Sequence, residues 1–214
     1  MNLNHFEYSK GNRKIGTDTI IFNMGSATNC PSKELGFCKI EKCYAMKAEH
    51  LYPQSLPYRN RQEAYWLSND AESIALDLCG ALLRHQKTVR FVRVNEAGDM
   101  HSKECLSKLI QIAKIVGKEF PKVVIYTYTH RSDIVTGTTH RRLPKNLVIN
   151  CSNFHRKGLN TFKAIASVKV HKMAEIATRK KEILKFADFA CVGDCSICGY
   201  CKKPHGKVIG IPLH

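Results

Sequence analysis

Acidic residues and long apolar runs are both scarce in this sequence. Its 214 residues include 18 Asp and Glu against 34 Lys and Arg, which gives a formal net charge of +16. No apolar run is long enough to span a membrane, so we expect no membrane contact. The opening MNLNHFEYSKGNRKIG is polar and has no apolar signal-peptide core, so we expect a cytoplasmic protein.

Three common enzyme motifs are absent as well. The sequence contains no P-loop, no G-x-G-x-x-G and no G-x-S-x-G. Their absence argues against the usual nucleoside triphosphatases, dinucleotide-binding enzymes and serine hydrolases. Any chemistry must therefore come from other residue types.

The excess of positive charge favours a polyanionic partner, either nucleic acid or a nucleotide. The alternative is a basic surface that only keeps the protein soluble, because charge provides attraction without specificity. Cations interleave with aromatic residues or crowd together in four places, namely 58–66, 131–145, 179–181 and 202–203. The sequence does not indicate an oligomeric state.

Cysteine, in contrast, is abundant. Four of the ten cysteines fall within eleven residues, CVGDCSICGYC, at Cys191, Cys195, Cys198 and Cys201. Thiols in the cytoplasm stay reduced, which favours metal binding over disulfides. Steps of C-x3-C and C-x2-C are typical of iron–sulfur and zinc sites. We expect a [4Fe–4S] cluster here, with zinc as the alternative.

A looser group of three cysteines lies upstream, at Cys30, Cys38 and Cys43. These thiols could bind a metal themselves, or one or more of them could join the C-terminal set. The alternative is that they are buried free thiols. Their Gly-, Pro- and Lys-rich surroundings are not typical of a core, which favours ligation.

Strand-like and helix-like segments alternate through the middle of the chain. Strands are expected at 19–24, 89–94, 122–128, 147–151 and 164–170. One helix is expected to begin after a cap at Asn69, with Glu72 completing a capping box, and to end near residue 86. A second helix is expected to begin after a cap at Ser102, and a third to span 171–186. This alternation predicts parallel βα units.

The chain is too short for a closed eight-unit barrel. We therefore expect an α/β fold, an incomplete or compact TIM-barrel-like parallel βα domain with Cys-rich N-terminal and C-terminal segments. Residues 1–214 would form one domain, in which 1–60 is an irregular Cys-containing segment, 61–188 the βα core and 189–214 the Cys-cluster tail.

Polar residues follow the expected strands. Parallel sheets place their sites at the carboxyl ends of strands, so these residues predict a pocket. We assign acid–base roles to Glu96, Asp99 and His130. Ligand-binding roles are assigned to Asn95, Thr129, Asn150 and Ser152. Two alternatives stay open: ordinary turn residues, or a divalent-metal nuclease site at Glu96, Asp99 and His101.

Three stretches together resemble the phage "gene product eighty-eight" type of protein. They are NCPSKELGFCKIEKCYA, VRFVRVNEAGDMHSKECLSKLIQIAK and a strand ending YTYTHR, within roughly residues 20–200. The resemblance implies a phage or mobile-element source, and hence host-cell cytoplasm, with an iron–sulfur site. It also implies a relation to radical-SAM barrels.

The stretch CVGDCSIC has the C-x3-C-x2-C spacing of radical-SAM enzymes, in which three cysteines hold a [4Fe–4S] cluster and its open iron binds S-adenosylmethionine. Here the motif lies last in the chain, and Cys201 could fill the open iron. We expect an iron–sulfur protein, a radical-SAM-like enzyme acting on nucleic acid or a nucleotide. The alternatives are a zinc- or cluster-stabilised nucleic-acid-binding module and a metal-dependent nuclease.

Overall fold

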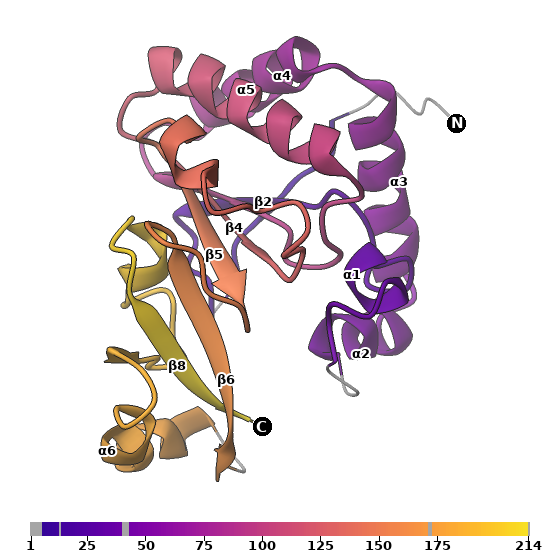
Figure 1. Ribbon diagram of the computed structural model, residues 1–214. Helices are drawn as coiled ribbons and strands as arrows, with labels where there is room; N and C mark the ends of the chain where they lie inside the picture. Colours follow the sequence, from indigo (N-terminus) through magenta and orange to yellow (C-terminus); the bar gives the residue numbers. More distant parts are fainter. Residues whose placement is uncertain (1–5, 13, 40–42, 171–172, 214) are drawn as a thin grey trace.

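The computed structural model describes residues 6–12, 14–39, 43–170 and 173–213 (Figure 1). The strands are β1 (Ser9–Lys10), β2 (Thr19–Phe22), β3 (Phe91–Val94), β4 (Val124–Thr129), β5 (Leu147–Ser152), β6 (Asn160–Lys169), β7 (Phe189–Ala190) and β8 (Val208–Leu213). The α-helices are α1 (Pro31–Glu34), α2 (Tyr44–Leu51), α3 (Ser55–Ser68), α4 (Ala71–Arg84), α5 (Lys103–Glu119) and α6 (Lys180–Ile183). Short 3-10 turns are η1 (Thr139–Arg142), η2 (Met173–Arg179) and η3 (Tyr200–Lys202).

One eight-stranded sheet organises the protein, in the order β1-β2-β3-β4-β5-β6-β8-β7. Only β1 pairs in the antiparallel sense, and every other neighbouring pair is parallel. The sheet does not close on itself. The predicted α/β class with mostly parallel strands is thus confirmed.

The alternation of β3 explains why the sheet has two different faces. Val92 and Val94 are buried in the main core beneath helices, together with Ile125 of β4. Because successive strand side chains point to opposite faces, Phe91 and Arg93 lie on the other face. Helices α4 and α5 lie together over the first face, and the apolar stripe of α5 joins the same core (Figure 1).

A second, smaller core lies beside the first. Its buried members include Ile165 of β6, Ile183 of α6 and Ile211 of β8, and half-buried Cys191 packs against it. This core joins the C-terminal residues to the sheet. The sheet consequently contains strands from all three segments into which the sequence was divided.

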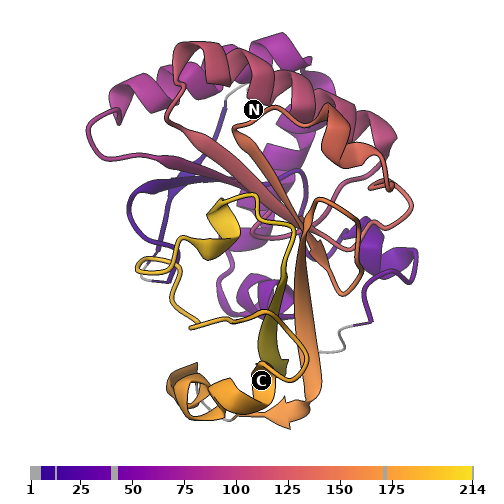
Figure 2. The same cartoon turned by 60° about the vertical axis from the view of Figure 1, so that its left-hand side comes forward.

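The cysteine-bearing segment covers the sheet face that α4 and α5 leave open (Figure 2). Lys202 fastens it there and is 4% exposed. Its Nζ lies 4.0 Å from the Phe91 ring centroid and 3.7 Å from Asp18 Oδ1. A cation on an aromatic face, paired with a carboxylate, can be buried at acceptable cost.

The start of α4 differs from the predicted start. Asp70, not Asn69, is the N-cap, and its Oδ1 accepts a hydrogen bond from the Ser73 N–H at 2.8 Å. Asn69 instead ends α3, where its Nδ2 donates to the Tyr65 carbonyl at 2.9 Å. The physical reason is reach, because a cap side chain bonds the N–H two or three residues ahead.

The strand predicted at 164–170 begins earlier, at Asn160. The single helix predicted over 171–186 was wrong, because η2 and the short α6 occupy the described part of that range. His171 and Lys172 lie outside the described residues. The strand begins with a polar residue, Asn160, so the apolar pattern does not indicate its start.

The N-terminal helices are joined by a buried ion pair. Arg59 of α3 donates from Nη1 to Glu49 Oε1 of α2 at 2.8 Å. Glu49 also accepts the N–H groups of Ala27 and Thr28. Burial raises the pKa of Glu49, but hydrogen bonds from Ala27, Arg59 and Thr28 outweigh this effect and hold the pKa below its usual value.

We predict that Glu49→Gln lowers the free energy of unfolding at pH 7 by about 3 kcal/mol, because it removes the nearer of the two carboxylates that pair with the buried Arg59. A carboxyl group whose pKa is depressed in the folded protein adds stability at pH values above its unfolded-state pKa. That stability is lost as the pH falls through the folded-state pKa. The gap between variant and wild type should therefore shrink below about pH 4. Urea unfolding at several pH values measures it.

The matched control is Glu182→Gln, which breaks the exposed Arg179–Glu182 pair. Surface pairs contribute little, so this change should stay within about 0.5 kcal/mol. Equal losses of unfolding free energy in the two variants would show that the buried Glu49–Arg59 pair contributes no more than an exposed pair.

Candidate metal centre

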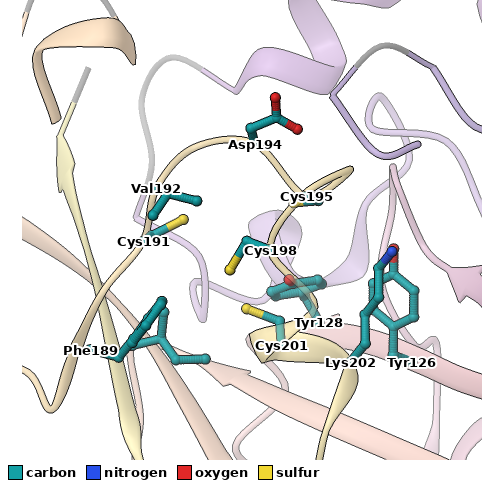
Figure 3. Close-up of a pocket in the computed structure, with 11 residues that line it drawn as sticks. Tyr126, Tyr128, Phe189, Cys191, Val192, Asp194, Cys195, Cys198, Cys201 and Lys202 are labelled. Atoms are coloured by element: carbon teal, nitrogen blue, oxygen red, sulfur yellow. The ribbon is translucent and has the colours of Figure 1, made fainter. Parts of the chain in front are cut away.

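The four C-terminal cysteines line one hollow of about 340 Å³, a volume that includes solvent space at its mouth. Its floor comes from Tyr126 and Tyr128 of β4. All four cysteines are free thiols, and the sulfurs of Cys191, Cys198 and Cys201 point into the same space (Figure 3). The predicted cysteine set is thus brought together over the sheet.

Two buried asparagines hold the cysteine segment on the sheet. Asn150 donates from Nδ2 to the Cys201 carbonyl at 3.1 Å. Asn160 donates to the Lys203 carbonyl at 2.9 Å and to Asn150 Oδ1 at 3.1 Å. Its Oδ1 accepts the N–H groups of His205 and Gly206. The segment has no strand ladder here, so side-chain amides supply the hydrogen bonds its backbone needs.

Aromatic stacking and two backbone bonds complete the attachment. The rings of Phe189 and Tyr200 stack at 4.0 Å with 10° between their planes, and His205 stacks on Tyr200 at 4.1 Å. The Cys191 N–H donates to the Gly210 carbonyl and the Cys195 N–H to the Lys14 carbonyl, both at 2.8 Å. The start of the loop is therefore tied to β8, and its second cysteine is tied to the N-terminal segment.

The electrostatics of the hollow disfavour free thiolates. Burial raises the pKa of Cys201 to about 12, with a further rise from the neighbouring cysteines, while the Tyr128 hydroxyl opposes it by hydrogen bonding. Burial also raises the pKa of Cys191, whose Sγ accepts the Gly193 N–H at 3.4 Å. Metal binding at such thiols must release protons, and a cation would offset the repulsion between thiolates.

The donor chemistry fits a thiolate-bound metal. Four soft ligands share one hollow, and N–H and O–H donors already reach two of the sulfurs. Within the ranges that the structure describes, no three Cys, His, Asp or Glu side chains are yet arranged as ligands of one ion. Binding therefore requires the thiols to turn towards one another about their side-chain bonds.

The predicted acid Asp99 is 2% exposed and is occupied by internal donors. Its Oδ2 accepts the Ser32 hydroxyl at 2.6 Å and the His130 N–H at 2.8 Å, and its Oδ1 accepts the Met100 N–H. Burial lowers the pKa of His130, against the opposing effect of Asp99. Thr129 Oγ1 accepts the Arg131 N–H.

Glu96 has a different set of partners. Its carboxylate lies 3.1 Å from Asn12 Nδ2 and 3.8 Å from Arg59 Nη2. Asn95, with φ of 66°, accepts the Met24 N–H on its Oδ1. Ser152 is buried at the end of β5. Glu96 and Asp99 thus bind different partners.

Gly98 makes this turn possible. Its φ of +69° lies in the left-handed region, and a Cβ there would come within 2.6 Å of the Gly25 carbonyl oxygen. Only glycine allows the two strand-end loops to approach this closely.

The upstream cysteines occupy another part of the protein. Cys30 precedes α1, where burial and then Asp99 raise its pKa to about 11, and Cys38 adds to this rise. Cys43 precedes α2 and packs beside Ala27, Ala45 and Ala97. None of the three lines the hollow of the C-terminal cysteines.

Sequence reasoning missed several residues that build this site, above all Asn160, Tyr126 and Tyr128. The two tyrosines had a usable signal, since the alternation Y-T-Y in β4 places both on one face. Asn160 had none, because its partners Lys203 and His205 lie more than forty residues away.

Fold and site define an open, mostly parallel α/β protein with a thiol-lined hollow on the sheet face opposite its main helices. The family described as Gene product 88 matches residues 6–207, so the chain belongs to that family. The resemblance predicted from the sequence is confirmed, and it supports a phage origin. No curated protein and no solved structure matches the chain. No helix in the described ranges has the length and apolar character to cross a membrane.

We predict that Asn160→Ala loosens the cysteine segment. The change removes hydrogen bonds to the backbone of residues 203, 205 and 206, and should cost about 1–3 kcal/mol of stability. The metal-free protein should then react faster with a thiol reagent at Cys201, as measured by mass spectrometry of alkylated peptides.

Asn146→Ala is the matched control, since Asn146 donates to the Ala113 carbonyl of α5. It should lower stability without changing Cys201 reactivity. Unchanged Cys201 reactivity in Asn160→Ala would contradict a clamping role.

Proposed function

We propose that this protein binds an iron–sulfur cluster through Cys191, Cys195, Cys198 and Cys201, and that it is a radical-SAM-like enzyme acting on nucleic acid or a nucleotide. The observation that carries the proposal is the gathering of four thiols around one hollow on the open face of a parallel sheet. A reducing host cytoplasm, the compartment we propose, keeps such thiols available.

The cysteine spacing favours a cluster over zinc. Four thiolates would complete either centre, but the stretch CVGDCSIC has the C-x3-C-x2-C spacing of the cysteines that hold a [4Fe–4S] cluster in radical-SAM enzymes. When bound, an iron–sulfur cluster supplies one-electron chemistry to a substrate beside it. The protein would orient the sulfurs by hydrogen bonds, from the Tyr128 hydroxyl to Cys201 and from the Gly193 N–H to Cys191.

The arrangement of the sheet supports the relation to an incomplete barrel. Strands β2 to β6 follow one another in chain order, which is the order found in TIM barrels. Helices cover one face and the hollow lies on the other. We therefore propose that the open sheet corresponds to part of a barrel, with S-adenosylmethionine as a cosubstrate if Cys201 leaves one iron open.

We predict that Cys191→Ser, Cys195→Ser and Cys198→Ser each lose most of their bound iron. Each substitution removes a soft ligand that serine replaces poorly. The wild-type protein, purified without oxygen, should be brown with a broad band near ~400 nm and carry about four irons per chain. Metal and sulfide analysis with absorption spectra provides the measurement.

Cys43→Ser and Cys79→Ser are the controls, because both thiols lie outside the hollow. They should keep their iron. Cys201→Ser separates a four-cysteine site from a three-cysteine site, since only the latter keeps its cluster in that variant. A colourless wild-type protein that contains zinc would contradict the proposal and favour a zinc-stabilised nucleic-acid-binding module.

We also propose a polyanionic partner, on the basis of the charge of +16. Exposed Arg141, Arg142 and Lys145 form one basic cluster near η1. Among the described residues, no carboxylate forms an ion pair with any of the three. Their charges are therefore available to phosphates.

We predict that changing Arg141, Arg142 and Lys145 together to Gln weakens binding of single-stranded oligonucleotides and lowers the slope of log K against log salt. Loss of three phosphate contacts lowers that slope by about 2, at roughly 0.7 per contact on single strands. Changing the exposed Lys103, Lys114 and Lys118 of α5 to Gln is the control of equal charge. Equal slopes in wild type and both variants would contradict a phosphate-binding role.

A further inference from the structure

Arg93 lies on the open face of the sheet, and none of the described carboxylates forms an ion pair with it. It belongs to β3, and its register partner on β4 is Tyr126, so the two residues are neighbours across the strands. Its guanidinium lies 4.9 Å from the Tyr128 ring centroid. Within the described ranges, no carboxylate comes within 4.0 Å of it.

Two hydrogen-bonding groups are left unused at this position. Arg93 Nε and the Tyr126 hydroxyl are both buried and have no hydrogen-bond partner among the residues described. Buried polar groups in native proteins are nearly always paired, because an unpaired one carries the full cost of its desolvation. A pair of unused donors on neighbouring strands therefore points to an acceptor that the described residues do not supply.

The one side-chain hydrogen bond that Arg93 makes to the described residues is weak. Its Nη2 lies 3.5 Å from the Tyr44 hydroxyl, at the limit of hydrogen bonding, while that hydroxyl donates to the Glu96 carbonyl at 2.8 Å. The Tyr44 residue is 66% exposed, so its ring can move aside without leaving a core. An incoming acceptor could replace this contact.

The chemistry of the group selects the ligand. A guanidinium is always charged and presents a planar fork that matches two oxygens of a carboxylate or phosphate. Stacking on Tyr128 fixes the plane of the fork. Tyr126 and Tyr128 also line the cysteine hollow, so a group held at Arg93 would lie beside the candidate metal centre.

We propose that Arg93, assisted by the Tyr126 hydroxyl, is the oxyanion-binding group for a small ligand on the open sheet face. The ligand carries a carboxylate or a phosphate, and the rest of it extends towards the cysteine hollow. In placing the ligand beside the metal centre the inference rests on the function proposed above, but oxyanion binding itself does not require the metal.

Calorimetric titration of the full-length protein tests this site with two matched pairs of probes. Adenosine 5′-monophosphate against adenosine reports on phosphate, and methionine against methioninol reports on carboxylate. We expect at least one anionic probe to bind the wild type, and Arg93→Gln to weaken it roughly tenfold to a hundredfold, the range of charge-assisted hydrogen bonds. Arg84→Gln, an exposed change of equal charge on α4, should keep wild-type affinity.

Two further variants keep the test decisive if Arg93→Gln folds poorly, which far-ultraviolet circular dichroism would detect. Arg93→Lys keeps the charge and loses the fork, and Tyr126→Phe removes only the unpaired hydroxyl. Both should weaken the anionic probe severalfold and leave the neutral analogue unchanged. The inference is overturned if no anionic probe binds better than its neutral analogue, or if these variants bind it as the wild type does.

The outcome can be separated from that of the proposed function. Cys198→Ser, which should lose iron, should keep its affinity for the anionic probe in the metal-free state. Iron bound without anion binding would overturn only the Arg93 site. Anion binding in a protein that never binds iron would overturn only the metal centre.

Discussion

The attachment of the cysteine segment to the open face of the sheet is the constraint on which the rest of the structure depends. Asn150 and Asn160 are buried on adjacent parallel strands and bond each other, so each fixes the orientation of the other amide. Together they supply hydrogen bonds to a backbone that has no ladder of its own. Without them the backbone from Cys201 to Gly206 would lose the side-chain hydrogen bonds that hold it over the sheet.

This attachment also sets the chemical character of the site. Burial makes Cys191 and Cys201 poor acids, and the gathering of cysteines in one hollow is unfavourable for several thiolates without a cation. On the same face, no carboxylate among the described residues forms an ion pair with Arg93. One face of the sheet thus carries both the four thiols and the Arg93 guanidinium. The main apolar core lies on the other face, beneath the helices.

The edges of the sheet are managed by length. The terminal strands β1 and β7 have two residues each, which gives another chain very little edge to pair with. The sheet can therefore remain open without offering a long template for aggregation. A closed barrel would have no edge strands at all. This sheet stays open and has loops and short helices around its rim.

Local pattern predicted the strands β2, β3, β4 and β5, because each is a short apolar or β-branched run whose side chains fill one core. It failed for β8, where Gly210 and Pro212 interrupt the run, and for the start of β6, where Asn160 is polar. It also missed that Asp70, not Asn69, caps α4. In each of these three places the structure depends on contacts that the pattern of apolar residues along the chain does not reveal.

The sequence by itself determined that four thiols lie close together, because eleven residues of chain cannot carry them far apart. Only the tertiary structure decided that Cys30, Cys38 and Cys43 lie outside their hollow, that Glu96 and Asp99 bind different partners, and that no carboxylate among the described residues forms an ion pair with Arg93. The reason is physical: connectivity limits distances along a short loop, whereas strand register and core packing set the distances between residues far apart in the chain.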